Sequence, residues 1–213
     1  MCSGRVDMAF VLRAFANGAD GVFIGGCWLG ECHYITEGNY DALSMMHLTR
    51  KVLEQIGVNP ERLRLNWVSA SEGIRFAEVV TDFTRTLTGL GPLGKSEGMD
   101  EGGLQLKLKA IKKILPYLKL VERERLRVRF RTDEEYDNFF NSDEVNRLIR
   151  DVIADKLTIS QITTLLESNP LSTKEISDII HVNPSEVSRH LNSSARQGLV
   201  RYDESRKRYA VAY

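Results

Sequence analysis

The chain has 213 residues, which is enough for one or two domains of ordinary size. Hydrophobic residues make up 42% and charged residues 27%, and the formal net charge is zero. This composition excludes a disordered chain and a uniformly basic nucleic-acid binder. No apolar run approaches the ~18 residues that a membrane span needs, and the first residues lack the apolar core of a signal peptide, so we expect a cytoplasmic protein.

Residues 1–93 are predicted to alternate between helices and strands. The predicted helices cover residues 6–16, 39–56 and 71–87, and the predicted strands cover residues 21–26 and 62–68. This order with short connections is typical of right-handed βαβ units around a parallel sheet. Two strands rarely form a stable sheet alone, so we predict an α/β domain whose parallel sheet is incomplete and flanked by helices.

The middle of the chain is predicted to hold a linker and a basic helix. Residues 94–103 contain four glycines and no branched apolar residue, which indicates a flexible linker and a domain boundary. From residue 104 a lysine-rich helix follows, with leucines and isoleucine on one face, and Pro116 is expected to kink or shorten it. We interpret it as a packed helix with a solvated face, although a membrane-surface or partner-binding helix shares this pattern. Alternating arginines at 125–131 then predict an edge strand, and connecting helices complete the segment 104–155.

Residues 156–213 are predicted to form a mostly helical domain that ends in a β-hairpin. Helices are expected around 159–168, 172–180 and 184–196, followed by strands at 199–202 and 207–211. Asn183 is the expected N-cap of the third helix, with Glu186 as its capping-box partner. His181 and His190 are expected on helix surfaces.

Three segments of this domain resemble the winged helix-turn-helix domains of ArsR-like regulators. They are Leu-Ser-Thr-Lys-Glu-Ile-Ser at 171–177, Pro-Ser-Glu-Val-Ser-Arg-His-Leu at 184–191 and Gly-Leu-Val at 198–200. The resemblance implies two groups of DNA contacts, in a major groove and beside phosphate at the wing: Ser185, Ser188, Arg189 and Asn192, and then Arg206, Lys207 and Arg208. From Lys156 onward, eight Lys/Arg face six Asp/Glu, a net charge of only +2. Winged helices also dock proteins, so DNA contact stays one possibility beside protein docking, which this weak positive charge favours slightly.

The three cysteines are the candidate site of the first domain. Cys27 follows the predicted strand 21–26, and Cys2 would end a preceding strand of which residues 1–2 are the last piece. Both would then lie at the carboxyl edge of the sheet, where α/β proteins bind ligands. Cys32 follows Cys27 with four residues between, among glycines. Three converging thiolates suit an iron–sulfur cluster, which usually takes four Cys ligands. A Cys3His zinc site with His33 and three unrelated buried cysteines remain alternatives, whereas the glycines do not fit a dinucleotide-binding motif.

Residues 1–93 also resemble a known family, the delta or iron–sulfur subunits of methyl-viologen-reducing hydrogenases. The segments that carry the resemblance are Met-Cys-Ser-Gly-Arg-Val-Asp at 1–7, Gly-Ala-Asp-Gly-Val-Phe-Ile-Gly-Gly-Cys at 18–27, Gly-Glu-Cys-His-Tyr at 30–34, Gly-Asn-Tyr at 38–40, Pro-Glu-Arg at 60–62, Trp-Val-Ser-Ala-Ser-Glu-Gly at 67–73 and Leu-Gly-Pro-Leu at 90–93. The resemblance implies an electron carrier with a [2Fe–2S] cluster on Cys2, Cys27 and Cys32.

The sequence departs from this family in two places. Trp28-Leu29 stand where the family usually has His-Pro, a change that removes no sulfur. Family members also usually carry an N-terminal strand and helix with further cysteines, so we expect a chain that is shortened relative to them and a fourth ligand that cannot be identified here. Our hypothesis is an internal start after an in-frame UGA read as stop instead of selenocysteine; a partner protein could instead supply the ligand.

The leading functional prediction is an electron-transfer subunit that is not a catalyst alone, since the sequence has no nucleophile–base pair at motif spacing. The resemblance implies hydrogenase or formate dehydrogenase subunits as donors and a heterodisulfide-reductase-like flavoprotein as acceptor. The alternative is a redox-sensing winged-helix transcription regulator, in which the cluster controls the approach of Arg189 and the wing to DNA.

Overall fold

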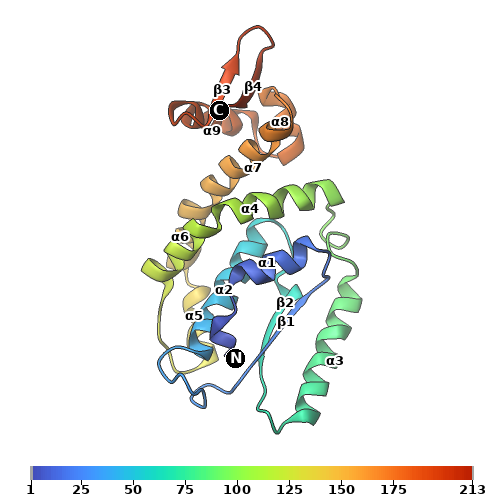
Figure 1. The fold of residues 1–213 in the computed structure, drawn as a ribbon, viewed down its shortest axis with the longest axis vertical. Coiled ribbons are helices and arrows are strands. Elements are labelled where there is room, and N and C mark those ends of the chain that lie inside the picture. The colour runs from blue at the N-terminus through green and yellow to red at the C-terminus, as the bar shows by residue number, and fades with distance from the viewer. Residues whose placement is uncertain (1, 213) are drawn as a thin grey trace. The chain divides into compact units, whose positions relative to one another are not determined.

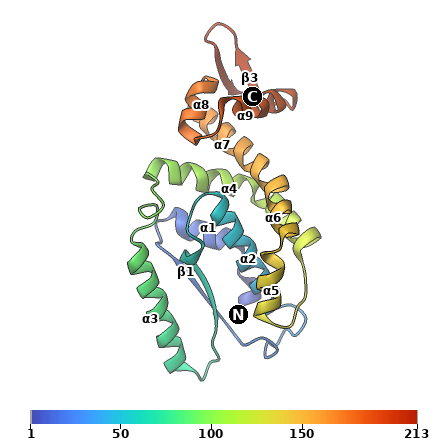
Figure 2. The same cartoon turned by 180° about the vertical axis from the view of Figure 1, so that it is seen from behind.

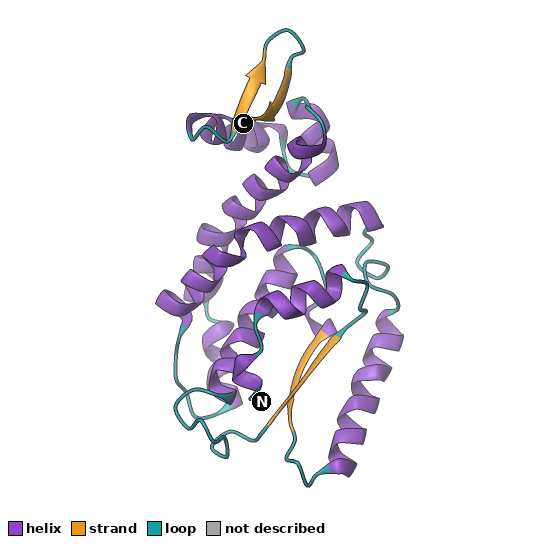
Figure 3. Ribbon diagram, viewed as in Figure 1, coloured by secondary structure: helices purple, strands orange, loops and turns teal. Residues whose placement is uncertain are grey.

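The computed structural model describes residues 2–212, so Met1, part of the first segment that carries the family resemblance, lies outside the described residues. Contacts between residues divide the chain into two compact units. The first contains the residues up to Asp100 together with Pro116–Ile149, and the second contains Glu101–Leu115 and Arg150–Tyr213. Helices predominate in both units, and each has one two-stranded sheet (Figure 3).

The first unit is a small parallel α/β arrangement. Its elements are a 3-10 turn η1 (Ser3–Arg5), α1 (Met8–Ala16), β1 (Val22–Gly26), α2 (Asn39–Gln55), a second 3-10 turn η2 (Pro60–Arg62), β2 (Leu63–Trp67) and α3 (Gly73–Leu90). Strands β1 and β2 pair in parallel, with Val22 opposite Leu63 and Gly26 opposite Trp67. The predicted parallel sheet with flanking helices is confirmed, and within residues 2–212 it has no third strand.

Helices cover both faces of this sheet (Figures 1 and 2). Helices α1 and α2 lie on one side and bury Phe15, Leu48 and Leu53. Helix α3 lies on the other side, where Phe23 of β1 contacts the rings of Phe76 and Phe83. The apolar side chains of a parallel sheet need cover on both faces, and the helices of the βαβ connections supply it. Because the two strands are parallel, their carboxyl ends lie at one edge of the sheet.

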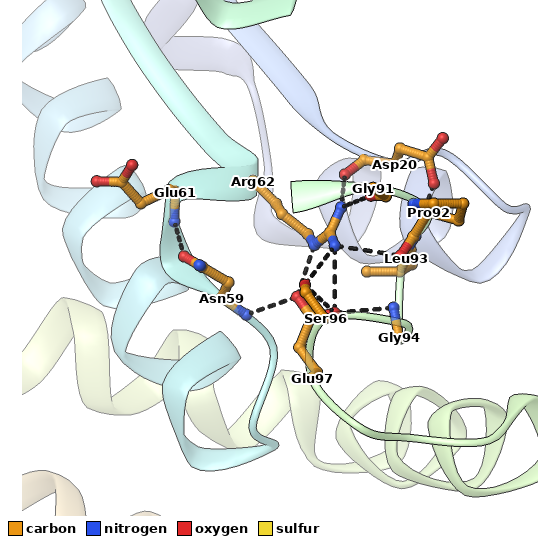
Figure 4. A network of polar contacts seen from close by, with 10 residues as sticks. All are labelled: Asp20, Asn59, Glu61, Arg62, Gly91, Pro92, Leu93, Gly94, Ser96 and Glu97. Carbon is orange, nitrogen blue, oxygen red and sulfur yellow. Dashed lines mark hydrogen bonds and ion pairs between the residues drawn. The ribbon is translucent and has the colours of Figure 1, made fainter. Parts of the chain in front are cut away.

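A buried arginine anchors the end of α3 and the turn that follows it (Figure 4). Arg62 is fully buried, and its guanidinium donates to the carbonyl oxygens of Asp20, Gly91 and Pro92 and to the carboxylate of Glu97. Glu97 also accepts hydrogen bonds from the backbone N–H groups of Asn59 and Gly94. The prediction of a flexible linker over 94–103 is therefore wrong, because a buried ion pair fixes its first half and helix α4 begins at Glu101.

Helix α4 (Glu101–Val121) contains Pro116 without ending there, so the expected shortening does not occur. Its predicted apolar face is buried, as the exposures of Leu104, Leu108, Ile111 and Leu118 show. A π-helical turn η3 (Glu122–Leu126) follows. The edge strand predicted for 125–131 is wrong: residues 127–130 have no regular structure, because Leu126 and Tyr136 are packed inside the unit instead of lining a sheet edge.

Two short helices complete the first unit. They are α5 (Asp133–Phe140) and α6 (Asp143–Ile149). Thr132 and Glu135 form a capping box at the start of α5. The helix packs on α2, where the ring of the buried His47 stacks on Tyr136 and, at 5.0 Å, on Phe140.

The second unit has the predicted order of helices followed by a two-stranded hairpin. Its elements are a π-helical turn η4 (Arg150–Ala154), α7 (Asp155–Ser168), α8 (Thr173–Ile180), α9 (Pro184–Arg196), β3 (Val200–Asp203) and β4 (Arg208–Val211), the last two antiparallel. Ile162, Ile176, Val187 and Leu191 lie in its core. Asn183 caps α9 as predicted, by accepting from the N–H of Ser185.

Within residues 2–212, no helix is both long and apolar enough to cross a bilayer.

Candidate functional site

The three cysteines converge at the carboxyl end of β1. Cys27 directly follows this strand, Cys2 precedes η1, and Cys32 lies in the loop that leads to α2. The Sγ atoms of Cys2 and Cys32 are 3.7 Å apart. Two thiolates bound at ~2.3 Å to one tetrahedral metal lie about 3.8 Å apart, so this pair already has the separation of two ligands of one metal.

Close backbone approaches hold the cysteine segments together. Gly38 has a φ of +57°, and a side chain there would collide with Sγ of Cys32. A side chain at Gly4 would collide with the backbone of Gly38, and one at Gly26 would lie 2.8 Å from the Trp67 ring. Only glycine fits these positions, which explains why glycines surround the cysteines in the sequence.

The electrostatic environment differs between Cys27 and Cys32. Burial raises the pKa of Cys27, and the neighbouring thiols of Cys32 and Cys2 raise it further. Burial would also raise the pKa of Cys32, but hydrogen bonds from the N–H groups of Tyr34 and Asn39 outweigh it and lower the pKa below its ordinary value. Because Asn39 is the first residue of α2, the Cys32 thiolate lies at a helix N-terminus, where negative charge is stabilised.

A hollow of about 520 Å³ opens beside Cys2 and Cys27. Its walls include the end of β1, the start of α3 and Phe76. The hydroxyl of Ser3, which also lines it, is buried without a hydrogen-bond partner among the described residues. Half-buried thiols, a free donor and open space together leave room for an inorganic group at this edge.

One close group of three potential metal ligands lies outside the cysteine site. Among the described residues, only Asp155, Glu186 and His190 form a group of three His, Cys, Asp or Glu donors within 4.8 Å of one another. The three thiols do not form such a group, although the thiol of Cys32 lies 3.7 Å from that of Cys2 and is a hydrogen-bond partner of that of Cys27. His33 is exposed and its ring lies against Tyr34, so the alternative of a Cys3His zinc site gains no support.

The residues predicted to contact DNA lie on α9 and in the hairpin of β3 and β4, and most of the cations form ion pairs or hydrogen bonds. Nη2 of Arg189 lies 3.2 Å from the Asp155 carboxylate, and Arg208 donates to Glu175 at 2.7 Å and to the carbonyl oxygen of Pro170. Arg206 lies 3.9 Å from Asp203. Lys207 is exposed and has no ion pair among residues 2–212. The three uncharged candidates lie on α9. Ser185 and Asn192 are exposed, and Ser188 is half-buried.

Two local expectations about this surface are wrong. His190 is buried rather than on the helix surface, and its Nε2 lies 3.2 Å from Nη2 of Arg189 and 3.6 Å from the Asp155 carboxylate. Glu186 does not complete a capping box: its carboxylate lies 3.7 Å from both Arg189 and His190 instead. Arg189 and His190 lie three and four residues further along the same helix, which is the spacing at which helix side chains meet, so the Glu186 carboxylate pairs with them and not with the N-cap.

Sequence reasoning did not identify Asn39, Glu72 and Arg75 as parts of the cysteine site. Asn39 is buried and donates to the carbonyl oxygens of Cys27 and Trp28. Glu72 accepts from Nε1 of Trp28, and Arg75 lies over the Trp28 ring. Asn39 and Glu72 do lie in the segments Gly-Asn-Tyr and Ser-Ala-Ser-Glu-Gly that carry the family resemblance, which was the available signal.

A parallel α/β fold with three thiols at its carboxyl edge defines a class of cysteine-site domain, and comparison with known proteins gives the family. Residues 1–91 match the family model "Methyl-viologen-reducing hydrogenase, delta subunit", and residues 158–202 match "Bacterial regulatory protein, arsR family". The chain belongs to the hydrogenase delta subunit family through its first 91 residues.

Similar proteins include both short and long chains. The chain is 56% identical over 91 residues to the iron–sulfur subunit of the F420-non-reducing hydrogenase of Archaeoglobus profundus, covering 43% of this chain and 66% of that one. It is 36% identical over 92 residues to the corresponding vhu iron–sulfur subunit of Methanopyrus kandleri, covering 43% and 69%. It is 47% identical over 94 residues to one subunit of the ferredoxin:CoB-CoM heterodisulfide reductase of Methanosarcina mazei, covering 44% and 12%. The match thus spans about two thirds of the hydrogenase subunits and an eighth of the reductase chain.

Proposed function

We propose that this chain is an iron–sulfur electron-transfer subunit, with Cys2, Cys27 and Cys32 as cluster ligands. The observation that carries the proposal is the 3.7 Å approach of Cys2 and Cys32 at the carboxyl edge of the sheet, beside Cys27. The names of the hydrogenase relatives describe them as iron–sulfur subunits, which supports the same cofactor here.

The cluster that suits this donor set best is [2Fe–2S]. Cys2 and Cys32 have the spacing of two ligands on one iron, and Cys27 supplies a third thiol beside them for a second iron. Such a cluster usually takes four cysteines, and the sequence contains three. The fourth ligand therefore comes from a group other than these three thiols. A bound cluster supplies one-electron chemistry, and the protein supplies ligands and hydrogen bonds to their sulfur atoms.

We further propose that the chain passes electrons from a hydrogenase or formate dehydrogenase to a heterodisulfide-reductase-like flavoprotein in the cytoplasm, without catalysing a reaction alone. The relatives support both ends of this route, because their names include a hydrogenase and a heterodisulfide reductase. In this proposal the winged helix docks a partner protein. The pairing of Arg189 and Arg208 with carboxylates is consistent with such a role, since it reduces the free positive charge of this surface.

The test is anaerobic reconstitution of the full chain with iron and sulfide. We expect about two irons and two sulfides per chain, the electron paramagnetic resonance of a reduced [2Fe–2S] cluster, and rapid reduction by hydrogen when a hydrogenase is present. Zinc bound in place of iron, or no metal at all, would contradict the proposal.

A redox-sensing transcription regulator is the second candidate, because the winged helix presents Ser185 and Asn192 on an exposed face of α9. It predicts sequence-specific duplex binding that changes with the oxidation state of the cluster. The logarithm of its affinity would fall linearly with the logarithm of salt concentration. If the chain binds no duplex specifically in either oxidation state, the electron-carrier proposal stands alone.

A further inference from the structure

Asn39 connects helix α2 to the loop that carries Cys27. The residue is fully buried, and its side-chain nitrogen donates to the carbonyl oxygen of Cys27 at 2.9 Å and to that of Trp28 at 2.7 Å. The same nitrogen lies 3.8 Å from Sγ of Cys27, within the distance of an N–H to sulfur hydrogen bond. One amide group thus contacts the carbonyl oxygens of this cysteine and of the next residue, and the cysteine sulfur.

The chemistry of these contacts requires an amide donor. Two carbonyl oxygens and one sulfur surround the Asn39 nitrogen, and all three are acceptors. Because the amide has two N–H groups, the longer contact to sulfur shares one of them with a carbonyl oxygen. Its Oδ1 atom is buried and accepts no hydrogen bond from the described residues. An aspartate of the same shape would bring a negative oxygen against these acceptors, and burying such a contact is unfavourable.

Helix α3 holds the same loop from the opposite side. The indole Nε1 of Trp28 donates to Glu72 at 2.8 Å, and the guanidinium carbon of Arg75 lies 4.5 Å from the centre of the indole ring. Glu72 is itself held by the N–H of Ser69. The Trp28 side chain is therefore fixed by α3, whereas the backbone at Cys27 is fixed by Asn39 of α2.

We propose that Asn39 is the positioning residue of Cys27, and that its amide stabilises negative charge on the sulfur. This inference rests on the proposed function in taking Cys27 as a cluster ligand. A cluster gains an electron on reduction, and N–H donors near its sulfur atoms favour the more negative state. The Asn39 amide therefore raises the reduction potential of a cluster bound there and limits the motion of Cys27 when none is bound.

The test compares the variants Asn39→Ala and Asn39→Asp with the control Thr49→Ala in the full chain. Thr49 is a buried polar residue of the same helix, and its hydroxyl donates to Met45 away from the cysteine loop. The first measurement uses metal-free, reduced protein and follows iodoacetamide alkylation at each cysteine by mass spectrometry. We expect iodoacetamide to alkylate Cys27 at least threefold faster in both Asn39 variants than in the unmodified chain. The alkylation rates of Cys2 and Cys32 should stay within twofold of those in the unmodified chain.

The second measurement is the midpoint potential of the reconstituted protein. We expect Asn39→Ala to lower it so that the ratio of reduced to oxidised cluster at a fixed potential falls about tenfold, which corresponds to about 59 mV for one electron. Thr49→Ala should leave the potential unchanged. Equal acceleration at all three cysteines, or the same alkylation pattern in Thr49→Ala, would overturn the inference by showing a general loss of stability. If the unmodified chain binds no iron, the proposed function fails, and the alkylation pattern alone decides the role of Asn39.

Discussion

Sγ of Cys2 lies 3.7 Å from Sγ of Cys32, although thirty residues separate them in the sequence. The close approach depends on backbone packing: η1 follows Cys2 and lies against α2, where Gly4 meets Gly38 without room for a side chain. The Cys32 sulfur in turn lies against Gly38. The cysteine site is therefore sensitive to changes that add even a single carbon atom at these glycines.

Replacing any one of Cys2, Cys27 and Cys32 by serine is expected to abolish stable cluster binding. Each change removes a thiolate from a donor set that already holds only three. Iron and sulfide per chain after anaerobic reconstitution measure the effect. His33→Ala is the control, because its exposed ring lies against Tyr34, and it should retain the iron of the unmodified chain. Loss of metal in His33→Ala would instead favour the Cys3His zinc site.

Gly38→Ala should destabilise the first unit more than Gly98→Ala. Both glycines have a positive φ, +57° and +64°, so both substitutions carry a backbone cost of about 1–2 kcal/mol. Only the added carbon at Gly38 meets other atoms, namely Sγ of Cys32 and the backbone of Tyr34, whereas Gly98 faces open space. Denaturant unfolding gives the free-energy difference, and equal costs at the two positions would show that the contact with Cys32 is unimportant.

Breaking the ion pair of Arg62 and Glu97 by Arg62→Met should cost about 3–5 kcal/mol of unfolding free energy. Both side chains are buried, with exposed fractions of 0% and 4%, so the variant leaves a carboxylate without its partner. Arg64→Met is the matched control, because Arg64 pairs with the largely exposed Asp82 and its loss should cost less than about 1 kcal/mol. A cost at Arg62 as small as that at Arg64 would contradict the structural role of the buried pair.

The same ion pair predicts loss of stability in acid. Burial alone would raise the pKa of Glu97, but hydrogen bonds from Arg62, Ser96 and the N–H of Asn59 outweigh it and lower the pKa to about 2. A depressed carboxyl pKa adds stability that is present above the ordinary value of 4.5 and is lost as pH falls toward 2. The expected loss is about 3 kcal/mol, and it should be absent in Glu97→Gln, which is less stable than the unmodified chain at neutral pH.

His47 predicts a second loss of stability at a higher pH. Burial lowers its pKa from 6.5 to about 4, against the opposing effect of Asp137. Between these values the unfolded chain binds a proton that the folded chain does not, so stability should fall by up to about 3 kcal/mol as pH decreases from 6.5 to 4. His47→Phe preserves stacking on Tyr136 and Phe140 but cannot titrate, so its unfolding free energy should vary less over this range. An unchanged pH dependence would show that another group is responsible.

Elements whose causes are local could be predicted from the amino-acid sequence. Apolar periodicity located β1, β2 and α2, Asn183 marked the start of α9, and the strand order with short connections predicted the parallel sheet. The sequence also singled out Cys2, Cys27 and Cys32, because parallel strands bring their carboxyl ends to one edge. The predictions of helices and strands succeed because hydrophobic spacing and capping act over a few residues.

The pairing of distant polar groups, in contrast, depends on the folded chain. Arg62, Asn39 and Glu97 have no distinguishing spacing, and their importance comes from partners far away in the chain. The alternating residues 125–131 matched a strand pattern, but packing of Leu126 and Tyr136 inside the first unit excluded a sheet edge. Burial of the His190 ring had no signal in the sequence either. Desolvation and hydrogen-bond partnership are properties of the folded neighbourhood, so no local pattern could reveal them.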